Sequence, residues 1–483
     1  MKNVDKNINI FKKYYSEYLI LLLILILGFL IRLYRINSPL ADWHSFRQAD
    51  TASVSRIYKE SGVNLLYPKY HDISRVQSGK FNPQGYRFVE FPLFNAVHAL
   101  LSINFPSLSF EVCGRLVALI SSIFSAFFIY LIGKKIYDSG IGLIAATVFL
   151  FLPFNIYFSR VILPEPTAVA FAIASLYFFM LYTKGNRVFY LFLFSLLFSL
   201  GILVKPYIVF YGIPCFFWLL KNLGLSQIFK KRQIWISFLI IFLPFILWRI
   251  WMLKFPEGIP FWKWTFNGDG IRFRPAFFRW IFGERLGYLI LGVWGLVPLF
   301  WGLIGLKRKD WFINSLLIGM LLYVSTFATA NVRHDYYQTM LIPVVALIIS
   351  IGIKSLWNFE VNSSLYIRSI LVFSLGTAFL VSWSEVREFY LINHPEIIKA
   401  GIAVDRLAPH DSLVIADYNG DTAFLYHTKR SGWPVVELPI DELIEEGADF
   451  YASVNLDNSQ TQDFISKFKV LEKTSEYVII KLK

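Results

Sequence analysis

The chain has 483 residues, of which 56% are hydrophobic, 18% aromatic and only 17% charged. Soluble domains carry about 25% charged residues, so a soluble protein of this composition would expose too much apolar surface. The net charge of +14 does not indicate nucleic-acid binding, because the basic residues gather in short loops rather than on one soluble face. Apolar runs of roughly 17 to 22 residues, long enough to cross a bilayer, separate these loops. The sequence therefore predicts an α-helical polytopic membrane protein.

Eleven apolar runs are predicted to span the membrane, and the first is expected to be retained because it is too long for a signal peptide. The predicted spans are 18–36, 112–133, 141–158, 162–183, 188–204, 206–220, 234–253, 286–306, 312–330, 339–357 and 366–384. Basic residues concentrate in alternate loops, at Lys12 and Lys13, Lys134 and Lys135, Lys184 and Arg187, Lys230–Arg232 and Lys307–Lys309. Because basic loops stay inside, the N-terminus is predicted to be cytoplasmic.

The opposite side receives a long first outer loop and the end of the chain. We predict a transmembrane domain over 1–384, with its first outer loop at 37–111, and a small extracytoplasmic α/β domain over 385–483. In the second, "SLVIADY" and "YVIIKL" are β-rich, and "IDELIEEGADFYA" is predicted to be helical. Cys113 and Cys215 both lie in apolar runs, which indicates neither a disulfide nor a metal site.

The first outer loop opens with the polar stretch "ADWHSFRQADTAS". Arg47, Asp50, Thr51 and Val54 recur at helical spacing, so one helix face could present a guanidinium and a carboxylate together. Asp42 lies just before them, where the chain leaves the membrane. A plain salt-bridge network at the interface is the alternative interpretation.

Further polar residues fall on the same predicted side. Glu165 lies between two prolines at the mouth of a span, where burial requires a partner for its charge. Lys205 separates two apolar runs and needs an anion, such as a lipid phosphate. "RHDYYQ", over 333–338, gathers a guanidinium, an imidazole, a carboxylate and two phenols. Each residue alone could be an interfacial anchor, but together they indicate a site.

Several of these stretches match a known family. "HSFRQADTASVSRIYKESGVNLLYP", "VEFPLFNAV", "ILPEPTAVAF", "GILVKPYIV" and "HDYYQTMLIPVVALIISIGI" follow one another in the chain. In this order they resemble the GT-C glycosyltransferases of family 39, whose relatives include the protein O-mannosyltransferases and the lipid A aminoarabinose transferases. The resemblance covers Phe46–Ile353 and is less specific in the last 100 residues.

The resemblance implies eleven to thirteen spans, a sugar donor carried on a polyprenyl phosphate, and a catalytic carboxylate in the first outer loop. Many relatives have an Asp-Glu pair where this chain has Arg47-Gln48, so Asp42 and Asp50 are the candidates, with Asp42 slightly preferred. Glu165 resembles the second acidic residue of the family, and we expect the catalytic set to be Asp42, Asp50 and Glu165. The residues expected to bind the donor phosphate or the substrate are Arg47, Gln48, Glu90, Lys205, Arg333, His334 and Tyr337.

The implied chemistry needs one base, because the leaving group is already a stable phosphate. A carboxylate removes the proton of the acceptor hydroxyl, and attack opposite the phosphate predicts inversion. Fixed cations such as Lys205 and Arg333 would stabilise the phosphate charge. The acceptor would be an envelope lipid, glycan or protein, the surrounding partners would be membrane lipids, and the sugar could be a hexose or a pentose.

Other interpretations stay open at this point. No cofactor is required, but a divalent metal ion could assist, since His44, Asp50, His71 and Asp72 share a loop without a recognised ligand spacing. The alternating "FWKWTF" aromatics around Trp264 could guide a prenyl chain or stack on a sugar, although an interfacial belt is more usual. The rival functions are a lipid or sugar transporter or flippase, a non-catalytic envelope assembly factor, and a polysaccharide polymerase or ligase.

Overall fold

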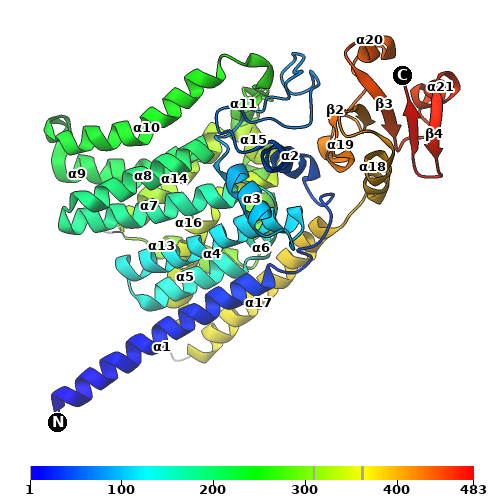
Figure 1. Cartoon of the computed structure of the whole chain (residues 1–483). Helices are drawn as coiled ribbons and strands as arrows, with labels where there is room; N and C mark the ends of the chain where they lie inside the picture. Colours follow the sequence, from blue (N-terminus) through cyan, green and yellow to red (C-terminus); the bar gives the residue numbers. More distant parts are fainter. Residues whose placement is uncertain (1, 308–309, 360–363) are drawn as a thin grey trace.

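The protein is described by a computed structural model, which covers residues 2–307, 310–359 and 364–483. A helical bundle fills one part of the molecule, and a small sheet with its helices fills the other (Figure 1). Among the basic residues predicted to face the cytoplasm, Lys12, Lys13, Arg308 and Lys309 lie outside the residues whose side chains are described.

The bundle consists of apolar helices that coincide with the predicted spans. They are α1 (Lys2–Ile31), α4 (Phe110–Ile136), α5 (Ser139–Phe151), α6 (Pro153–Phe158), α7 (Glu165–Gly185), α8 (Val188–Val204), α9 (Ile213–Lys230), α10 (Arg232–Met252), α13 (Leu296–Gly305), α14 (Trp311–Thr326), α16 (Ile342–Trp357) and α17 (Ser364–Val386). By length and composition, five segments of the described chain can cross a membrane: Phe110–Ile136, Glu165–Gly185, Pro206–Lys230, Arg232–Met252 and Ser364–Leu407. Shorter apolar helices account for the other predicted spans.

Several predicted spans are broken where the backbone requires it. The span at 141–158 divides at Pro153, whose ring cannot continue the hydrogen bonding of α5. The span at 286–306 divides after the π-helical segment η4 (Arg279–Ile290), because Gly292 and Val293 adopt positive φ angles of 51° and 60°. Gly292 also lies close to α17, since a Cβ there would be 2.1 Å from the carbonyl oxygen of Ala378.

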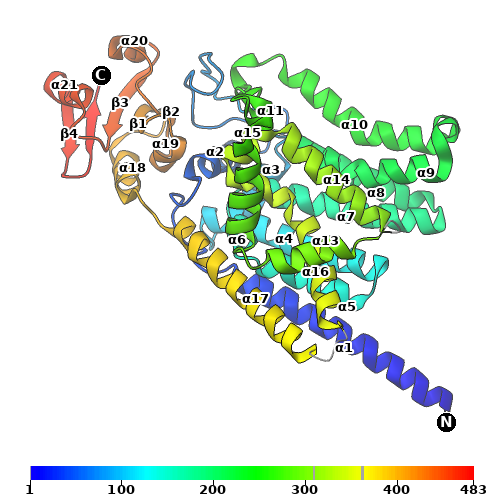
Figure 2. The same ribbon diagram turned by 180° about the vertical axis from the view of Figure 1, so that it is seen from behind.

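Shorter elements cover one end of the bundle. In the first outer loop these are α2 (Ser45–Ser61) and α3 (Leu93–Asn104), which confirms the predicted helix around Arg47 and Asp50. The others are η1 (Pro206–Gly212), η2 (Pro256–Gly258), α11 (Trp264–Asn267), η3 (Ile271–Phe273), α12 (Pro275–Phe278), α15 (Ala328–Arg333), η5 (Asp335–Met340) and η6 (Arg387–Tyr390). In both views α2 lies between the bundle and the sheet (Figures 1 and 2).

The last part of the chain is an α/β unit with a five-stranded mixed sheet in the order β2-β1-β3-β5-β4. Its strands are β1 (Leu413–Asp417), β2 (Ser431–Trp433), β3 (Ala448–Ser453), β4 (Lys469–Lys473) and β5 (Val478–Lys481). Its helices are α18 (Pro395–Leu407), α19 (Thr422–Thr428), α20 (Ile440–Glu445) and α21 (Ser459–Lys467). β1 pairs in parallel with β2 and β3, while β5 pairs antiparallel with β3 and β4.

The predicted helix over "IDELIEEGADFYA" is wrong in its second half. Only Ile440–Glu445 is helical, and Ala448–Ser453 forms the central strand β3. Gly447 has a φ of 114°, which ends the helix and turns the chain into the sheet. The acidic residues before it gave the whole stretch a helical character that ends at this glycine.

The α/β unit is fastened to the first outer loop. Helix α19 packs on α2, where the Arg56 guanidinium lies 3.8 Å from the centre of the Tyr426 ring. Arg56 also donates to the carbonyl oxygen of Tyr426 at 2.7 Å, and the backbone of Ile73 donates to Gly432 at 2.9 Å. The first outer loop therefore contacts the bundle on one side and the α/β unit on the other.

Candidate functional site

Four alternating charges form one buried network where the first outer loop meets the bundle. The Arg47 guanidinium and the Lys205 ammonium both contact Oε1 of Glu90. Lys205 Nζ also lies 2.6 Å from Oε1 of Glu165. We call Arg47, Glu90, Lys205 and Glu165 the charge network. Its members come from segments up to 158 residues apart, and all of them were candidates in the sequence.

Local structure fixes each member of the network. Arg47 belongs to the first turn of α2, and Glu90 precedes the proline at which α3 begins. Glu165 starts α7 between two prolines, so its carboxylate meets the positive end of the helix dipole. Lys205 follows the last residue of α8, because Pro206 ends that helix. The network thus joins two helix starts to one helix end.

Glu90 is the anion shared by two cations. Its burial opposes ionisation, but Arg47 and Lys205 outweigh that effect and lower the pKa of its carboxyl to about 2. Glu165 has only Lys205 beside it, and neither of its carboxylate oxygens accepts a hydrogen bond from the described part of the chain. The network therefore keeps unused acceptor capacity at Glu165.

Asp50 lies one helical turn after Arg47 and has a separate set of partners. Its Oδ2 accepts from Arg87 Nη2 at 2.6 Å, and its Oδ1 accepts from Thr422 Oγ1 in the α/β unit at 2.8 Å. A cavity of about 20 Å³, enough for about one water, borders both this group and the network. Its polar walls are made by Arg47, Asp50, Thr51, Arg87, Glu90 and Asn95.

Asp42 belongs to a different cluster, in which both of its carboxylate oxygens accept hydrogen bonds. Its Oδ1 accepts from Gln48 Nε2 at 2.7 Å, and its Oδ2 accepts from Arg160 Nη2 at 3.0 Å. The Gln48 side-chain oxygen accepts from the Ile162 backbone at 3.2 Å. We call Asp42, Gln48 and Arg160 the Asp42 cluster, and it does not border the cavity. Asp42 and Gln48 thus lie apart from Arg47, Glu90, Lys205 and Glu165.

Arg333 and His334 line an open pocket next to the network. This pocket, which we call the loop pocket, has a volume of about 420 Å³ and is lined by Trp264, Gly268, Asp269, Thr329, Arg333 and His334. Arg333 Nη2 lies 2.7 Å from Asp269 Oδ2. Burial, with the neighbouring His44, lowers the pKa of His334 to about 4, so its imidazole is neutral near pH 7. Arg333 therefore faces this pocket and not the shared anion Glu90.

Tyr337 is buried in a group of aromatic rings. Its ring centre lies 4.6 Å from that of Tyr336 and 5.5 Å from that of Tyr207. The His334 ring stacks on Tyr336 at 5.5 Å, so this aromatic group is in contact with one residue of the loop pocket.

The four residues considered as ligands of a divalent metal each contact other protein groups and do not face one common point. His44 faces Asp335 at 3.7 Å, while His71 Nδ1 lies 3.0 Å from Ser53 Oγ. Asp72 accepts from Tyr70 and from the Ser74 backbone. Within the described residues, no three His, Cys, Asp or Glu side chains converge as a metal site would require. The donor set of the first outer loop does not fit a bound metal.

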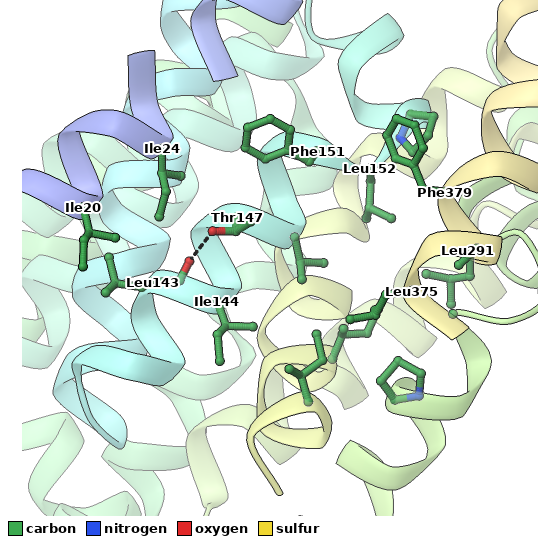
Figure 3. Close-up of a pocket in the computed structure, with 17 residues that line it drawn as sticks. Ile20, Ile24, Leu143, Ile144, Thr147, Phe151, Leu152, Leu291, Leu375 and Phe379 are labelled. Carbon is green, nitrogen blue, oxygen red and sulfur yellow. Dashed lines mark hydrogen bonds between the residues drawn. The ribbon is translucent and has the colours of Figure 1, made fainter. Parts of the chain in front are cut away.

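Another cavity lies elsewhere in the bundle and is apolar. It has a volume of about 490 Å³ and is bordered by α1, α5, α13, α16 and α17 (Figure 3). Thr147 is its one lining residue with a side-chain hydroxyl, which donates to the carbonyl oxygen of Leu143 at 2.8 Å. This groove offers surface for hydrocarbon but no group that could catalyse a reaction.

Sequence reasoning missed the partners of the candidate residues. Arg87 and Arg160 hold Asp50 and Asp42, and Arg285 contacts Asp335, which also accepts from Trp43 Nε1 at 2.8 Å. Arg249 of α10 donates only to Met252 Sδ, at 3.4 Å, and has no acidic side chain within ion-pair distance among the described residues. A signal existed, because each arginine stands in an apolar stretch where a charge needs a partner.

Comparisons with known proteins agree with this architecture. The sequence model of the family described as dolichyl-phosphate-mannose-protein mannosyltransferase matches residues 95–251. ArnT from Cupriavidus metallidurans, in its crystal structure bound to undecaprenyl phosphate, has a TM-score of 0.67 at 11% identity, covering 95% of this chain and 97% of its own. Archaeal oligosaccharyltransferase AglB from Archaeoglobus fulgidus, in complex with an inhibitory peptide and a dolichol-phosphate, gives 0.57 at 10% identity, covering 93% and 70%. No curated protein sequence matches.

The structural neighbours have low sequence identity, so they establish the fold. The chain is an integral membrane protein with the GT-C fold and a C-terminal α/β domain. Together with the family match, this confirms the resemblance to the GT-C glycosyltransferases, the class that includes O-mannosyltransferases and lipid A aminoarabinose transferases. The chain thus has the fold of the GT-C glycosyltransferases, and residues 95–251 match the family model of one group within that class.

Proposed function

We propose that the protein transfers one sugar, a hexose or a pentose, from a polyprenyl-phosphate donor to an envelope lipid, glycan or protein. The observation that carries this proposal is the convergence of Arg47 and Lys205 on the single anion Glu90. Two fixed cations around one anionic group are the arrangement that a transferred phosphate requires. Two structural neighbours, one bound to undecaprenyl phosphate and one in complex with a dolichol-phosphate, support the donor class.

The donor phosphate would take the place of the Glu90 carboxylate between the two cations. The cavity of about 20 Å³ is too small for a sugar, so donor binding requires these ion pairs to part. Arg249 would supply an additional positive charge, because its guanidinium is not neutralised by a nearby carboxylate of the described chain. Arg47, Lys205 and Arg249 would thus hold the phosphate, with Lys205 kept in place by Glu165.

Asp50 is our candidate for the base. It borders the cavity, whereas Asp42 does not, and it is not shared between two cations as Glu90 is. Its carboxylate would take the proton of the acceptor hydroxyl while that oxygen attacks the anomeric carbon opposite the phosphate. The bond from carbon to phosphate oxygen breaks, the polyprenyl phosphate leaves as an anion, and the configuration inverts. Asp42 would position the start of α2 through Gln48.

The proposed orientation follows the distribution of basic loops. With the N-terminus in the cytoplasm of a bacterial inner membrane, residues 37–111 and the domain proposed for 385–483 would lie outside, beside the envelope acceptor. Membrane lipids would surround the domain proposed for 1–384.

The test is sugar transfer by the purified full chain. Labelled polyprenyl-phosphate monosaccharides are offered with an envelope extract to the wild type and to Asp50→Asn, Asp42→Asn and Glu165→Gln. We expect Asp50→Asn to stay folded and to lose transfer, because an amide cannot accept the proton. If Asp42→Asn is folded but inactive while Asp50→Asn works, the base is Asp42. A wild type that consumes no donor would reject the transferase in favour of a transporter or an assembly factor.

A further inference from the structure

The loop pocket is a second polar space, separate from the charge network and beside it. The His334 ring in its wall lies 5.6 Å from the ring of His44 and 6.0 Å from that of Phe46, at the start of α2. Arg47 and Asp50 follow in the first turns of the same helix. A ligand in this pocket would therefore lie against the helix that carries the proposed base.

Charge in the loop pocket favours a neutral ligand. Arg333 is paired with Asp269 at 2.7 Å, so its guanidinium is already neutralised, and an anion would meet the Asp269 carboxylate. His334 adds no charge near pH 7, since burial and His44 keep its pKa at about 4. Both hydrogen-bond donors and hydrogen-bond acceptors remain in the pocket. This combination suits the hydroxyl groups of a ligand better than a phosphate.

Trp264 adds an aromatic surface to this polar pocket. Its indole nitrogen donates to the carbonyl oxygen of Phe261 at 2.8 Å, so the ring is fixed from α11. The His334 ring meets it edge-on at 5.6 Å. Two polar atoms of the wall, His334 Nδ1 and Thr329 Oγ1, are buried without a hydrogen-bond partner in the described chain. Such atoms call for a polar ligand or water.

We propose that the loop pocket binds a neutral pyranose ring of the acceptor. Trp264 would stack on the apolar face of the ring, and Asp269 and Arg333 would hydrogen-bond its hydroxyls. The proposal names a glycan or glycolipid rather than a peptide, because a flat aromatic face beside a planar ion pair matches a sugar ring. The statement that the bound ring belongs to the acceptor rests on the proposed function. The statement that the pocket binds a pyranose ring does not.

Binding is measured first, by saturation-transfer NMR on the full chain in a detergent without sugar groups. The probes are methyl α-mannopyranoside, methyl β-glucopyranoside, inorganic phosphate and a serine-threonine peptide. We expect at least one pyranoside to receive saturation, with at least a fivefold loss in Trp264→Ala and none in Trp262→Ala. Trp262 is the matched control because it is 51% exposed and does not line the pocket.

Three results would overturn the proposal: no pyranoside signal, an unchanged signal in Trp264→Ala, or displacement of the sugar by phosphate. Binding of the peptide in place of the sugars would reject the glycan assignment. In the transfer assay, Trp264→Ala should raise the KM for a glycan acceptor about tenfold, whereas Trp262→Ala should leave that KM unchanged. A wild type that binds pyranosides but never consumes donor would reject the proposed function and leave the sugar site standing.

Discussion

The charge network and the Asp42 cluster are both buried and both join the first outer loop to the bundle, yet they differ in what they leave unused. Both oxygens of Asp42 accept hydrogen bonds, from Gln48 and Arg160. In the network, neither oxygen of Glu165 accepts one from the described chain, and the neighbouring groups border a cavity. The two groups therefore differ at Glu165 and at the cavity, and we take the cavity, which Asp50 also borders, as the feature that distinguishes the candidate site.

The largest expected effect comes from breaking the Asp42 cluster. Arg160→Met leaves the buried Asp42 carboxylate without its cation, which should cost about 3–5 kcal/mol in the free energy of unfolding. The measurement is unfolding of the purified protein in detergent, followed by intrinsic fluorescence. Arg279→Met is the control, because it breaks an exposed pair with Glu284 and should stay within about 1 kcal/mol of wild type. Equal stability of the two variants would show that the Asp42 cluster is not structural.

The charge network should respond in activity rather than in folding. Lys205→Met removes a cation proposed to face the phosphate, and transfer should fall by about 10²–10³-fold, as for the loss of one oxyanion donor. The rate of sugar transfer is measured on protein shown to be folded. Lys354→Met is the control, because it breaks a pair with Asp138 away from the network and should leave the rate unchanged. A similar loss in both variants would contradict the assignment of the network to the reaction.

A smaller effect, on the pH dependence of the free energy of unfolding, should appear at Asp421, where the α/β unit meets α2. Burial, with the nearby Asp50 charge, raises the pKa of Asp421 to about 6 from an ordinary 3.8. Since the folded state binds this proton more tightly, the stabilisation is complete below pH 3.8 and is lost as the pH rises through about 6. The Asp421→Asn variant keeps the side-chain cap of α19, and it does not lose stability as the pH rises because its side chain has no proton to release.

This variant should therefore match the wild type at pH 4 and exceed it by about 1–2 kcal/mol at pH 7.5. The measurement is unfolding of both proteins across that range. Asp441→Asn, in α20 away from α2, is the control, and its difference in stability from the wild type should not change with pH. A constant difference between Asp421→Asn and the wild type at all pH values would contradict the proton linkage.

The smallest effect concerns the hydrogen bond from the α/β unit to the proposed base. Thr422→Val removes the donor to Asp50 Oδ1, which should cost about 1 kcal/mol and slow transfer about fivefold. The rate of sugar transfer is measured on protein shown to be folded. Thr461→Val, which loses a hydrogen bond inside the α/β unit, should leave the rate unchanged. An unchanged rate in Thr422→Val would argue against Asp50 as the base.

The sequence predicts helices well where one physical rule dominates. The apolar runs and the polar spacing at Arg47 and Asp50 correspond to helices, while "ADFYA" became a strand because Gly447 and its sheet neighbours outweigh local helical preference. Glu165 and Lys205 could be recognised as buried charges, but their pairing with each other and with Glu90 depends on packing across the bundle. The division into a network and an Asp42 cluster follows from such long-range contacts, which spacing along the chain does not encode.

Glu165 and Lys205 also set a condition on how the protein is made. A ribosome produces Glu165 first and Lys205 only 40 residues later, so α7 enters the bilayer before its counter-ion exists. A lone carboxylate is costly in that environment. The later ion pair with Lys205 offsets that cost, so it links the membrane insertion of α7 to that of α8 during synthesis.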